Sequence, residues 1–207
     1  MWDILPHMPF PFTRKPRAIE ESPKQAALSF LFELIQVLAI SLAIIIPVRY
    51  FLIQPFYVKG ASMEPNFFDH EYLIIDELSY RFRTPERGDI VVLRYPNNLK
   101  QYFIKRLIGL PGETIEIAGG HVKIFNDAHP NGFLLNEMGY LDQEFTATTR
   151  TVTLKGNEFF VLGDNRVASL DSRYFGPVTR NLIIGRVWLR GWPLDRWKAF
   201  ERPNYQT

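Results

Sequence analysis

The chain has 207 residues, of which 46% are hydrophobic and 14% aromatic, and its formal net charge is +2. This length and composition suit one folded domain with a short appendage. The charge is too small, and the Lys and Arg residues are too dispersed, to indicate nucleic-acid binding. The chain lacks cysteine and its four histidines are not spaced as paired ligands, which argues against a metal site and against thiolate chemistry.

A basic, proline-rich segment precedes a long apolar run near the N-terminus. Residues Leu34–Val48 carry no charge, and apolar neighbours extend the run to residues 27–53, enough for the roughly 20 residues that span a bilayer. The positive-inside rule then places the N-terminus in the cytoplasm. The pattern predicts a single-pass protein of the plasma membrane, with a cytoplasmic arm (1–26), a transmembrane anchor (27–53) and everything after it outside the cytoplasm. A buried soluble helix or a cleaved signal peptide is the alternative.

Short strands separated by turns follow the apolar run. With no long amphipathic helix between them, they predict a mainly β, antiparallel domain over residues 54–207. A smaller β lobe is expected over about residues 113–157 within it. The expected strands, rich in Val, Ile, Phe and Tyr, are Glu71–Asp76, Asp89–Tyr95, Gln101–Leu110, Thr114–Ile117, His121–Phe125, Arg150–Leu154, Glu158–Leu162 and Leu182–Leu189.

Serine is the most available nucleophile in this β domain, because the chain has no cysteine. Ser62 has the most suggestive context. Gly60 before it and Pro65 after it can hold its hydroxyl on a tight turn with free backbone N–H groups. An ordinary structural turn is the alternative. The other candidates are Ser79, Ser169 and Ser172.

A serine hydroxyl needs a base, and Lys105 is the best candidate. It lies in the segment Tyr102–Ile108, where alternation places Lys105 and Arg106 on opposite faces and both faces are apolar. Whichever way the strand turns, one cation is pressed against hydrophobic side chains, and burial can lower a lysine pKa by up to about 3–5 units. A lysine that snorkels from a strand edge is the alternative.

A dense polar cluster over residues 163–173 follows the apolar strand Glu158–Leu162. Buried charges need partners, so Asp164 or Asp171 could pair with Arg106 or Arg173. The plainer interpretation is a structural turn held by ion pairs.

Four segments in this order, after one anchor, resemble bacterial type I signal peptidases. They are residues 60–65 (Gly-Ala-Ser-Met-Glu-Pro), 87–92, 103–113 and 163–173, and the resemblance extends from the anchor to about Arg190. It implies a membrane-bound serine endopeptidase with the fold of signal peptidases and SOS-repressor proteases. Such an enzyme removes N-terminal signal peptides from exported preproteins through an acyl-enzyme and needs no cofactor.

The resemblance also implies roles for individual residues. Ser62 is the expected nucleophile, Lys105 the general base, and Ser169 the hydroxyl that orients the lysine amine. Some members carry a serine two positions before the nucleophile to bind the oxyanion. This chain has Gly60 there, which leaves the Ser62 backbone N–H and a neighbouring one as donors, so the expected oxyanion residues are Ser62 and Gly60. The expected supporting residues are Arg106, Asp164, Asp171 and Arg173.

The expected partners are signal-peptide-bearing preproteins and the lipid bilayer, with no nucleic acid and no metal. The cleavage segment would lie as an added strand beside residues 101–104 and the stretch before Ser62. The walls of its groove would favour small side chains, as in an Ala-x-Ala site. The expected substrate-binding residues are Met63, Tyr102, Phe103 and Ile104.

Two other functions remain open. A soluble Ser/Lys protease of the SOS-repressor type is disfavoured by the apolar run, and a non-catalytic membrane-tethered binding module is disfavoured by the presence of Ser62, Lys105 and Ser169 together. Near the C-terminus, aromatic and basic residues are interleaved. One hypothesis is that this segment rests on the membrane surface, and the alternative is ordinary core and surface packing. The aromatic members are Trp188, Trp192, Trp197 and Phe200.

Overall fold

The computed structural model describes residues 23–47, 54–141, 146–203 and 205. The chain divides at residues 45 and 46 into two compact units, a helical one and a β one, and each is described by itself. The predicted cytoplasmic arm up to residue 22 and the end of the predicted anchor, residues 48–53, lie outside the described residues.

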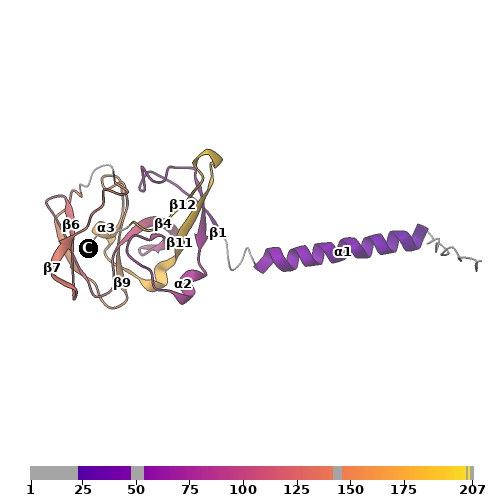
Figure 1. The fold of residues 1–207 in the computed structure, drawn as a ribbon, viewed down its shortest axis with the longest axis horizontal. Helices are drawn as coiled ribbons and strands as arrows, with labels where there is room; N and C mark the ends of the chain where they lie inside the picture. Colours follow the sequence, from indigo (N-terminus) through magenta and orange to yellow (C-terminus); the bar gives the residue numbers. More distant parts are fainter. Residues whose placement is uncertain (1–22, 48–53, 142–145, 204, 206–207) are drawn as a thin grey trace, which may run out of the picture. The chain divides into compact units, whose positions relative to one another are not determined.

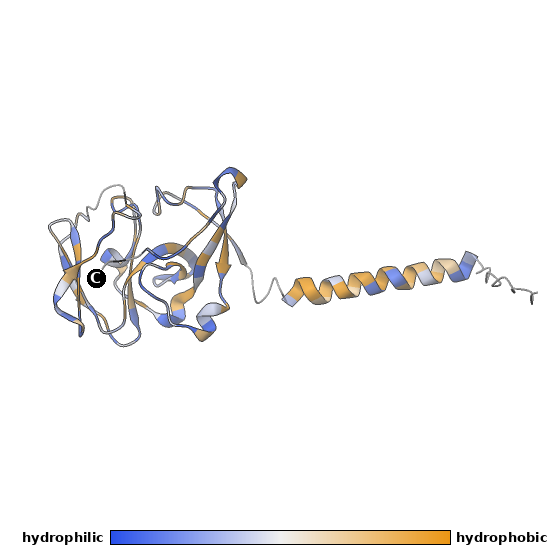
Figure 2. Ribbon diagram, viewed as in Figure 1, coloured by the Kyte–Doolittle hydropathy of each residue, from blue (hydrophilic) through white to orange (hydrophobic). Residues whose placement is uncertain are grey.

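The helical unit contains α1, which runs from Pro23 to Pro47 and has 25 residues. Figure 2 shows it as hydrophobic along most of its length, and nearly all its side chains are exposed. A helix that is apolar around its circumference and unburied has no soluble core to pack against. By length and composition α1 is able to cross a bilayer. Pro23 suits the first helical position, because proline lacks an N–H that would be unpaired there.

The β unit is built on an eight-stranded sheet in which every pairing is antiparallel (Figure 1). Seven strands follow the order β1-β2-β11-β3-β4-β9-β10, and β12 pairs with β11. The strands are β1 (Gln54–Tyr57), β2 (Tyr72–Asp76), β3 (Ile90–Tyr95), β4 (Asn98–Gly109), β9 (Glu158–Leu162), β10 (Val178–Thr179), β11 (Ile183–Trp192) and β12 (Lys198–Ala199).

A second, four-stranded sheet lies between β4 and β9 in the chain and has the order β7-β6-β5-β8. Its strands are β5 (Thr114–Ala118), β6 (His121–Asn126), β7 (His129–Leu134) and β8 (Arg150–Thr153). The alternating apolar residues of β5 and β6 bury one face against Phe160 and Leu162 of β9. We call this sheet, with the segment that joins β7 to β8, the inserted lobe.

The predicted mainly β, antiparallel fold is confirmed, and all eight expected strands are present with ends that differ by at most three residues. Sequence patterning missed four strands: β1, β7, β10 and β12. β7 contains Pro130 and Gly132, which usually indicate a turn, and the other three have two to four residues. It also missed the short helices α2 (Ser79–Phe82), α3 (Ser172–Phe175), η2 (Arg180–Leu182) and η3 (Leu194–Arg196).

The core beneath the large sheet anchors the turn that carries Ser62. Met63 and Phe67, which follow the serine, are 1% and 0% exposed and pack with Val92 of β3 and Val187 of β11. Fully burying one such side chain stabilises a fold by about 1.5–3 kcal/mol. The turn is therefore fixed to the sheet by its own apolar residues.

Candidate active site

The fold brings Ser62 and Lys105 into contact, although 43 positions separate them in the chain. The Nζ atom of Lys105, on β4, lies 2.8 Å from the Oγ atom of Ser62 and 2.9 Å from the carbonyl oxygen of Ile104. The Lys105 side chain is 3% exposed, and its amine lies 5.2 Å from the centre of the Phe103 ring. A serine hydroxyl and a buried amine at this distance can exchange a proton.

Burial lowers the pKa of Lys105 from its ordinary value to about 8, while the carboxylates of Asp171 and Asp164 oppose that shift. Desolvation dominates because the charged ammonium loses more hydration than the neutral amine. About a tenth of this lysine is therefore uncharged at pH 7, far more than of a lysine with the ordinary pKa. An uncharged amine next to a hydroxyl is the arrangement that a general base requires.

The turn around Ser62 is held by the polar cluster of residues 163–173. The backbone N–H of Asn165 donates to the carbonyl oxygen of Ser62 at 3.1 Å, and the Asn165 side-chain amide donates to the carbonyl oxygen of Ala61 at 3.1 Å. The Oδ1 atom of Asn165 accepts from the Ala168 N–H at 3.1 Å. One asparagine therefore joins the serine turn to the loop that carries Ser169.

The predicted role of Gly60 in the oxyanion hole conflicts with the contacts of its backbone. The Gly60 N–H donates to Oδ1 of Asp69 at 2.9 Å, and a glycine has no side chain to donate in its place. Its φ of +88° is in the region that favours glycine, so the residue serves the geometry of the turn. In this structure Gly60 is therefore not free to stabilise an oxyanion.

Ser169 is buried beside the reacting pair, but its predicted hydrogen bond to Lys105 is not made in this structure. Among the described residues, the Ser169 hydroxyl has no hydrogen-bond partner. A Cβ atom placed on Gly163 would lie 2.1 Å from that hydroxyl oxygen and 2.5 Å from the carbonyl oxygen of Ser62. Only glycine leaves room for the Ser169 hydroxyl and the Ser62 turn to pack at this point.

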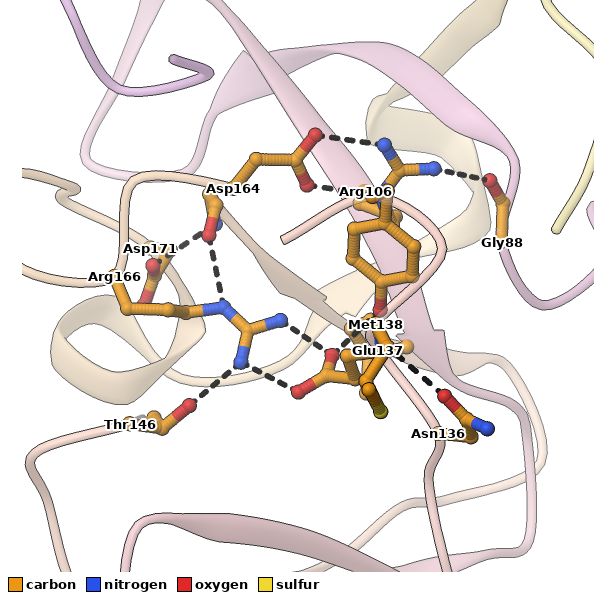
Figure 3. Close-up of polar contacts among 12 residues, drawn as sticks. Gly88, Arg106, Asn136, Glu137, Met138, Thr146, Asp164, Arg166 and Asp171 are labelled. Atoms are coloured by element: carbon orange, nitrogen blue, oxygen red, sulfur yellow. Dashed lines mark hydrogen bonds and ion pairs between the residues drawn. The ribbon is translucent and has the colours of Figure 1, made fainter. Parts of the chain in front are cut away.

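The four charged residues expected to support the site, Arg106, Asp164, Asp171 and Arg173, form two separate buried pairs. Arg106 and Asp164 make a bidentate ion pair with N···O distances of 2.8 and 2.7 Å, and Asn66 donates to the same carboxylate at 2.9 Å (Figure 3 shows the arginine and the aspartate). Arg173 and Asp171 make a second bidentate pair at 2.8 Å, and Asp171 also accepts from the Gly163 N–H. Of the pairings that the sequence left open, these two are the ones formed.

A groove of about 300 Å³ opens beside Ser62 and Lys105. Both residues line it, together with all four predicted substrate-binding residues, among which Met63 is buried and Tyr102 is half exposed. A wider depression of about 700 Å³ lies around Tyr80 and Arg180 and includes none of the predicted site residues. Within the described parts of the chain, no group of three or more His, Asp or Glu side chains could hold a metal ion.

Sequence reasoning assigned no role to Asn165, Asn66 or Asp69. Asn165 lies inside the polar motif that was singled out, so its presence beside Asp164 was the available signal. Asn66 and Asp69 follow Pro65 in the serine turn, and Asn and Asp in turns commonly bond backbone groups. Their actual partners lie far apart in the chain or across the turn, which patterning does not reveal.

Comparison with known proteins gives matches over most of the chain. The model of the family described as "Signal peptidase, peptidase S26" matches residues 31–192. A signal peptidase I from Leptolyngbya laminosa is 37% identical over 193 residues, covering 90% of this chain and 92% of the relative. The Bacillus subtilis (strain 168) protein named signal peptidase I V is 33% identical over 153 residues, covering 70% of this chain and 90% of the relative. A solved signal peptidase I from Enterococcus faecalis V583 is 35% identical, covers 51% of this chain and 97% of its own, and has a TM-score of 0.42.

Proposed function

Because the chain belongs to the signal peptidase I family and is a serine endopeptidase that removes signal peptides, we propose that Ser62 and Lys105 are its catalytic dyad. The observation that carries this proposal is the 2.8 Å separation of the serine hydroxyl and a lysine amine that is 3% exposed. The lowered pKa of Lys105, about 8, supports it, because only a neutral amine can accept the proton.

In the proposed reaction, neutral Lys105 takes the proton of the Ser62 hydroxyl as Oγ attacks the carbonyl carbon of the scissile peptide bond. The tetrahedral intermediate collapses when the lysine ammonium returns that proton to the leaving amine, and an acyl-enzyme ester remains. Water then attacks the ester with Lys105 again acting as base. The signal peptide leaves with a new carboxylate and the serine regains its proton.

The oxyanion of each intermediate needs hydrogen-bond donors, and the Ser62 backbone N–H is the donor that we propose. Gly60 is not proposed, because its N–H donates to Asp69. Ser169 fits a different task. Its buried hydroxyl has no partner among the described residues, which is costly in a core, and it can turn toward the Lys105 amine when the lysine is engaged in catalysis.

The substrate is proposed to bind as an extended strand along the start of β4. Residues 102–104 pair with β3 on one side, and pairing with β9 on the other side begins only at Arg106. The edge before Lys105 therefore has backbone groups that a peptide can use. The groove of about 300 Å³ beside it suits small side chains, which supports cleavage after an Ala-x-Ala-like segment.

The topology in the membrane is part of the same proposal. α1 is long and apolar enough to anchor the chain, and basic residues precede it, which favours a cytoplasmic N-terminus. The β unit would then act on the outer side, where exported preproteins present their cleavage sites. Protease protection of inverted membrane vesicles tests this orientation, because a cytoplasmic β unit would be digested.

The dyad is tested by incubating the full-length protein with a preprotein and comparing Ser62→Ala, Lys105→Ala and, as a matched control, Ser79→Ala. Ser79 belongs to the same unit but lies on α2 and not in the groove. We expect the first two variants to lose at least about a thousandfold in rate while remaining folded, and the control to cleave normally. Normal cleavage by either dyad variant would disprove the proposal.

A further inference from the structure

A buried ion pair joins the inserted lobe to the loop between β9 and α3, which carries Ser169. Glu137 lies in the segment that follows β7, and Arg166 lies in the loop between β9 and α3. The Arg166 Nη1 atom donates to Oε2 of Glu137 at 2.8 Å, and Nη2 donates to the other carboxylate oxygen (Figure 3). Each side chain is 3% exposed. The same Nη1 atom donates to the hydroxyl of Thr146 at 2.6 Å, so the arginine is held by two residues of the lobe.

Arg166 also holds the loop itself. Its Nε atom donates to the carbonyl oxygen of Gly163 at 3.0 Å, and its own carbonyl oxygen accepts from Arg173 at 2.7 Å. Gly163 is the residue that packs against both the Ser169 hydroxyl and the Ser62 carbonyl oxygen. A continuous set of contacts therefore runs from Glu137 through Arg166 and Gly163 to the nucleophile turn.

We propose that Glu137 is a positioning residue for catalysis, through which the inserted lobe fixes the loop that braces Ser62 and carries Ser169. This proposal rests on the proposed dyad and deepens it. Glu137 is not among the residues that line the substrate groove. It acts by neutralising Arg166, so that the arginine stays buried with its Nε directed at Gly163.

The physical reason is the cost of an unpaired buried charge. Without the Glu137 carboxylate, Arg166 loses both of its charged contacts, and the free energy of the protein is then lower when the guanidinium moves toward water. That movement withdraws its hydrogen bond from Gly163 and lets the loop shift. A displacement of about 1 Å near a reacting centre costs about 100-fold in rate, because the attack geometry is lost while substrate contacts elsewhere remain.

The inserted lobe also supplies a matched control. Glu113, just before β5, makes a bidentate ion pair with Arg87 and also accepts from Leu110 N–H and Asn126. This pair is buried to a similar degree, with side-chain exposures of 12% for Arg87 and 7% for Glu113. It joins Glu113 to the turn before β3, where Arg87 also donates to the Ile108 carbonyl oxygen of β4, and not to the loop that carries Ser169. Glu113→Gln therefore removes a comparable ion pair without disturbing residues 163–169.

The experiment measures kcat and KM of the full-length protein in detergent on a peptide spanning a signal-peptide cleavage site. For Glu137→Gln we expect kcat to fall by about 10- to 100-fold with KM within about threefold of wild type, at temperatures where circular dichroism shows the folded state. The acidic limb of its pH profile should also move, because the Lys105 surroundings change. Glu113→Gln should lower the melting temperature but leave kcat within about twofold.

Wild-type kcat in folded Glu137→Gln overturns the proposal, and so does an equal loss of kcat in Glu113→Gln. If Glu137→Gln does not fold, Thr146→Val tests the same connection more mildly. It removes one acceptor from Arg166, and a severalfold fall in kcat is expected, whereas an unchanged kcat overturns the proposal. Ser62→Ala is run in parallel. Activity in that variant would refute the dyad, whereas an inactive Ser62→Ala with a normal Glu137→Gln would refute only the role of Glu137.

Discussion

Gly163 lies so close to Ser169 that a Cβ atom on the glycine would be 2.1 Å from the serine hydroxyl oxygen. No side chain fits there unless the loop moves away from Ser62. The absence of a side chain at residue 163 is therefore a condition for the observed packing of the Ser169 hydroxyl against the Ser62 turn.

We predict that Gly163→Ala loses at least about 100-fold in kcat, because the loop and the Ser62 turn must separate to admit the methyl group. The overpacking should also lower the free energy of unfolding by about 1–3 kcal/mol. The control is Gly156→Ala, since a Cβ at Gly156 meets nothing within 4 Å. Cleavage assays at a temperature where both variants are folded decide the matter, and normal turnover by Gly163→Ala would contradict the packing argument.

The pH dependence of cleavage should report the ionisation of Lys105. Burial lowers its pKa from 10.5 to about 8, so the reactive neutral form is lost as the pH falls below that value. We expect kcat/KM to fall about tenfold for each pH unit below about 8 and to level off above it. The measurement uses a peptide substrate without titratable groups between pH 6 and 10. An acidic limb near 10.5 would mean that the amine is hydrated like an ordinary lysine.

The pair formed by Arg106 and Asp164 should matter for stability, because it is buried beneath the active site with side-chain exposures of 3% and 0%. Asp164→Asn leaves Arg106 uncompensated, and we expect it to lower the free energy of unfolding by about 3–5 kcal/mol. The double variant Arg106→Met/Asp164→Leu should recover much of that loss, since it removes both charges. Urea titrations of the three proteins test this.

Asp127→Asn is the control for that comparison, because Asp127 is exposed in the turn between β6 and β7. Its unfolding free energy should change by less than about 0.5 kcal/mol. A double variant less stable than Asp164→Asn would show that the pair itself, and not the unpaired charge, sets the stability.

The sequence predicted the strands well and singled out Ser62 and Lys105, which the structure brings into contact, because both inferences depend on local patterns. Alternation along Tyr102–Ile108 correctly placed Lys105 and Arg106 on opposite faces of one strand, and in the structure one contacts Ser62 and the other Asp164. Their individual environments could not be predicted, because each is created by a segment distant in the chain.

The contacts that hold the site together are long-range, and this is why they were missed. Asn165 bonds the Ser62 turn across about 100 positions, and Glu137 reaches Arg166 from the inserted lobe. From the sequence, an isolated acidic residue such as Glu137 is predicted to be an exposed charge in a loop, since its burial follows only from how the lobe packs. Likewise, the engagement of the Gly60 N–H by Asp69 depends on the path of the turn.

The hypothesis that the C-terminal aromatic residues meet the membrane remains testable, and the structure sharpens it. Trp188, Trp192 and Trp197 are 48%, 54% and 61% exposed around the β11–β12 hairpin, so core packing does not account for them. Phe200, in contrast, packs against Phe67 of the core and does not belong to this surface. Tryptophan favours the headgroup region, and the neighbouring exposed Lys198 would be drawn to anionic lipids.

We therefore expect quenching of tryptophan emission by brominated lipids when the full-length protein is reconstituted in anionic vesicles. A Trp2→Phe background removes the N-terminal tryptophan, and adding Trp192→Phe and Trp197→Phe should reduce the fraction quenched by lipid. Iodide in the water phase serves as the opposite probe. If the hairpin stands in solvent, iodide quenches the emission and the brominated lipids do not, because a quencher confined to the bilayer cannot reach side chains that remain in water.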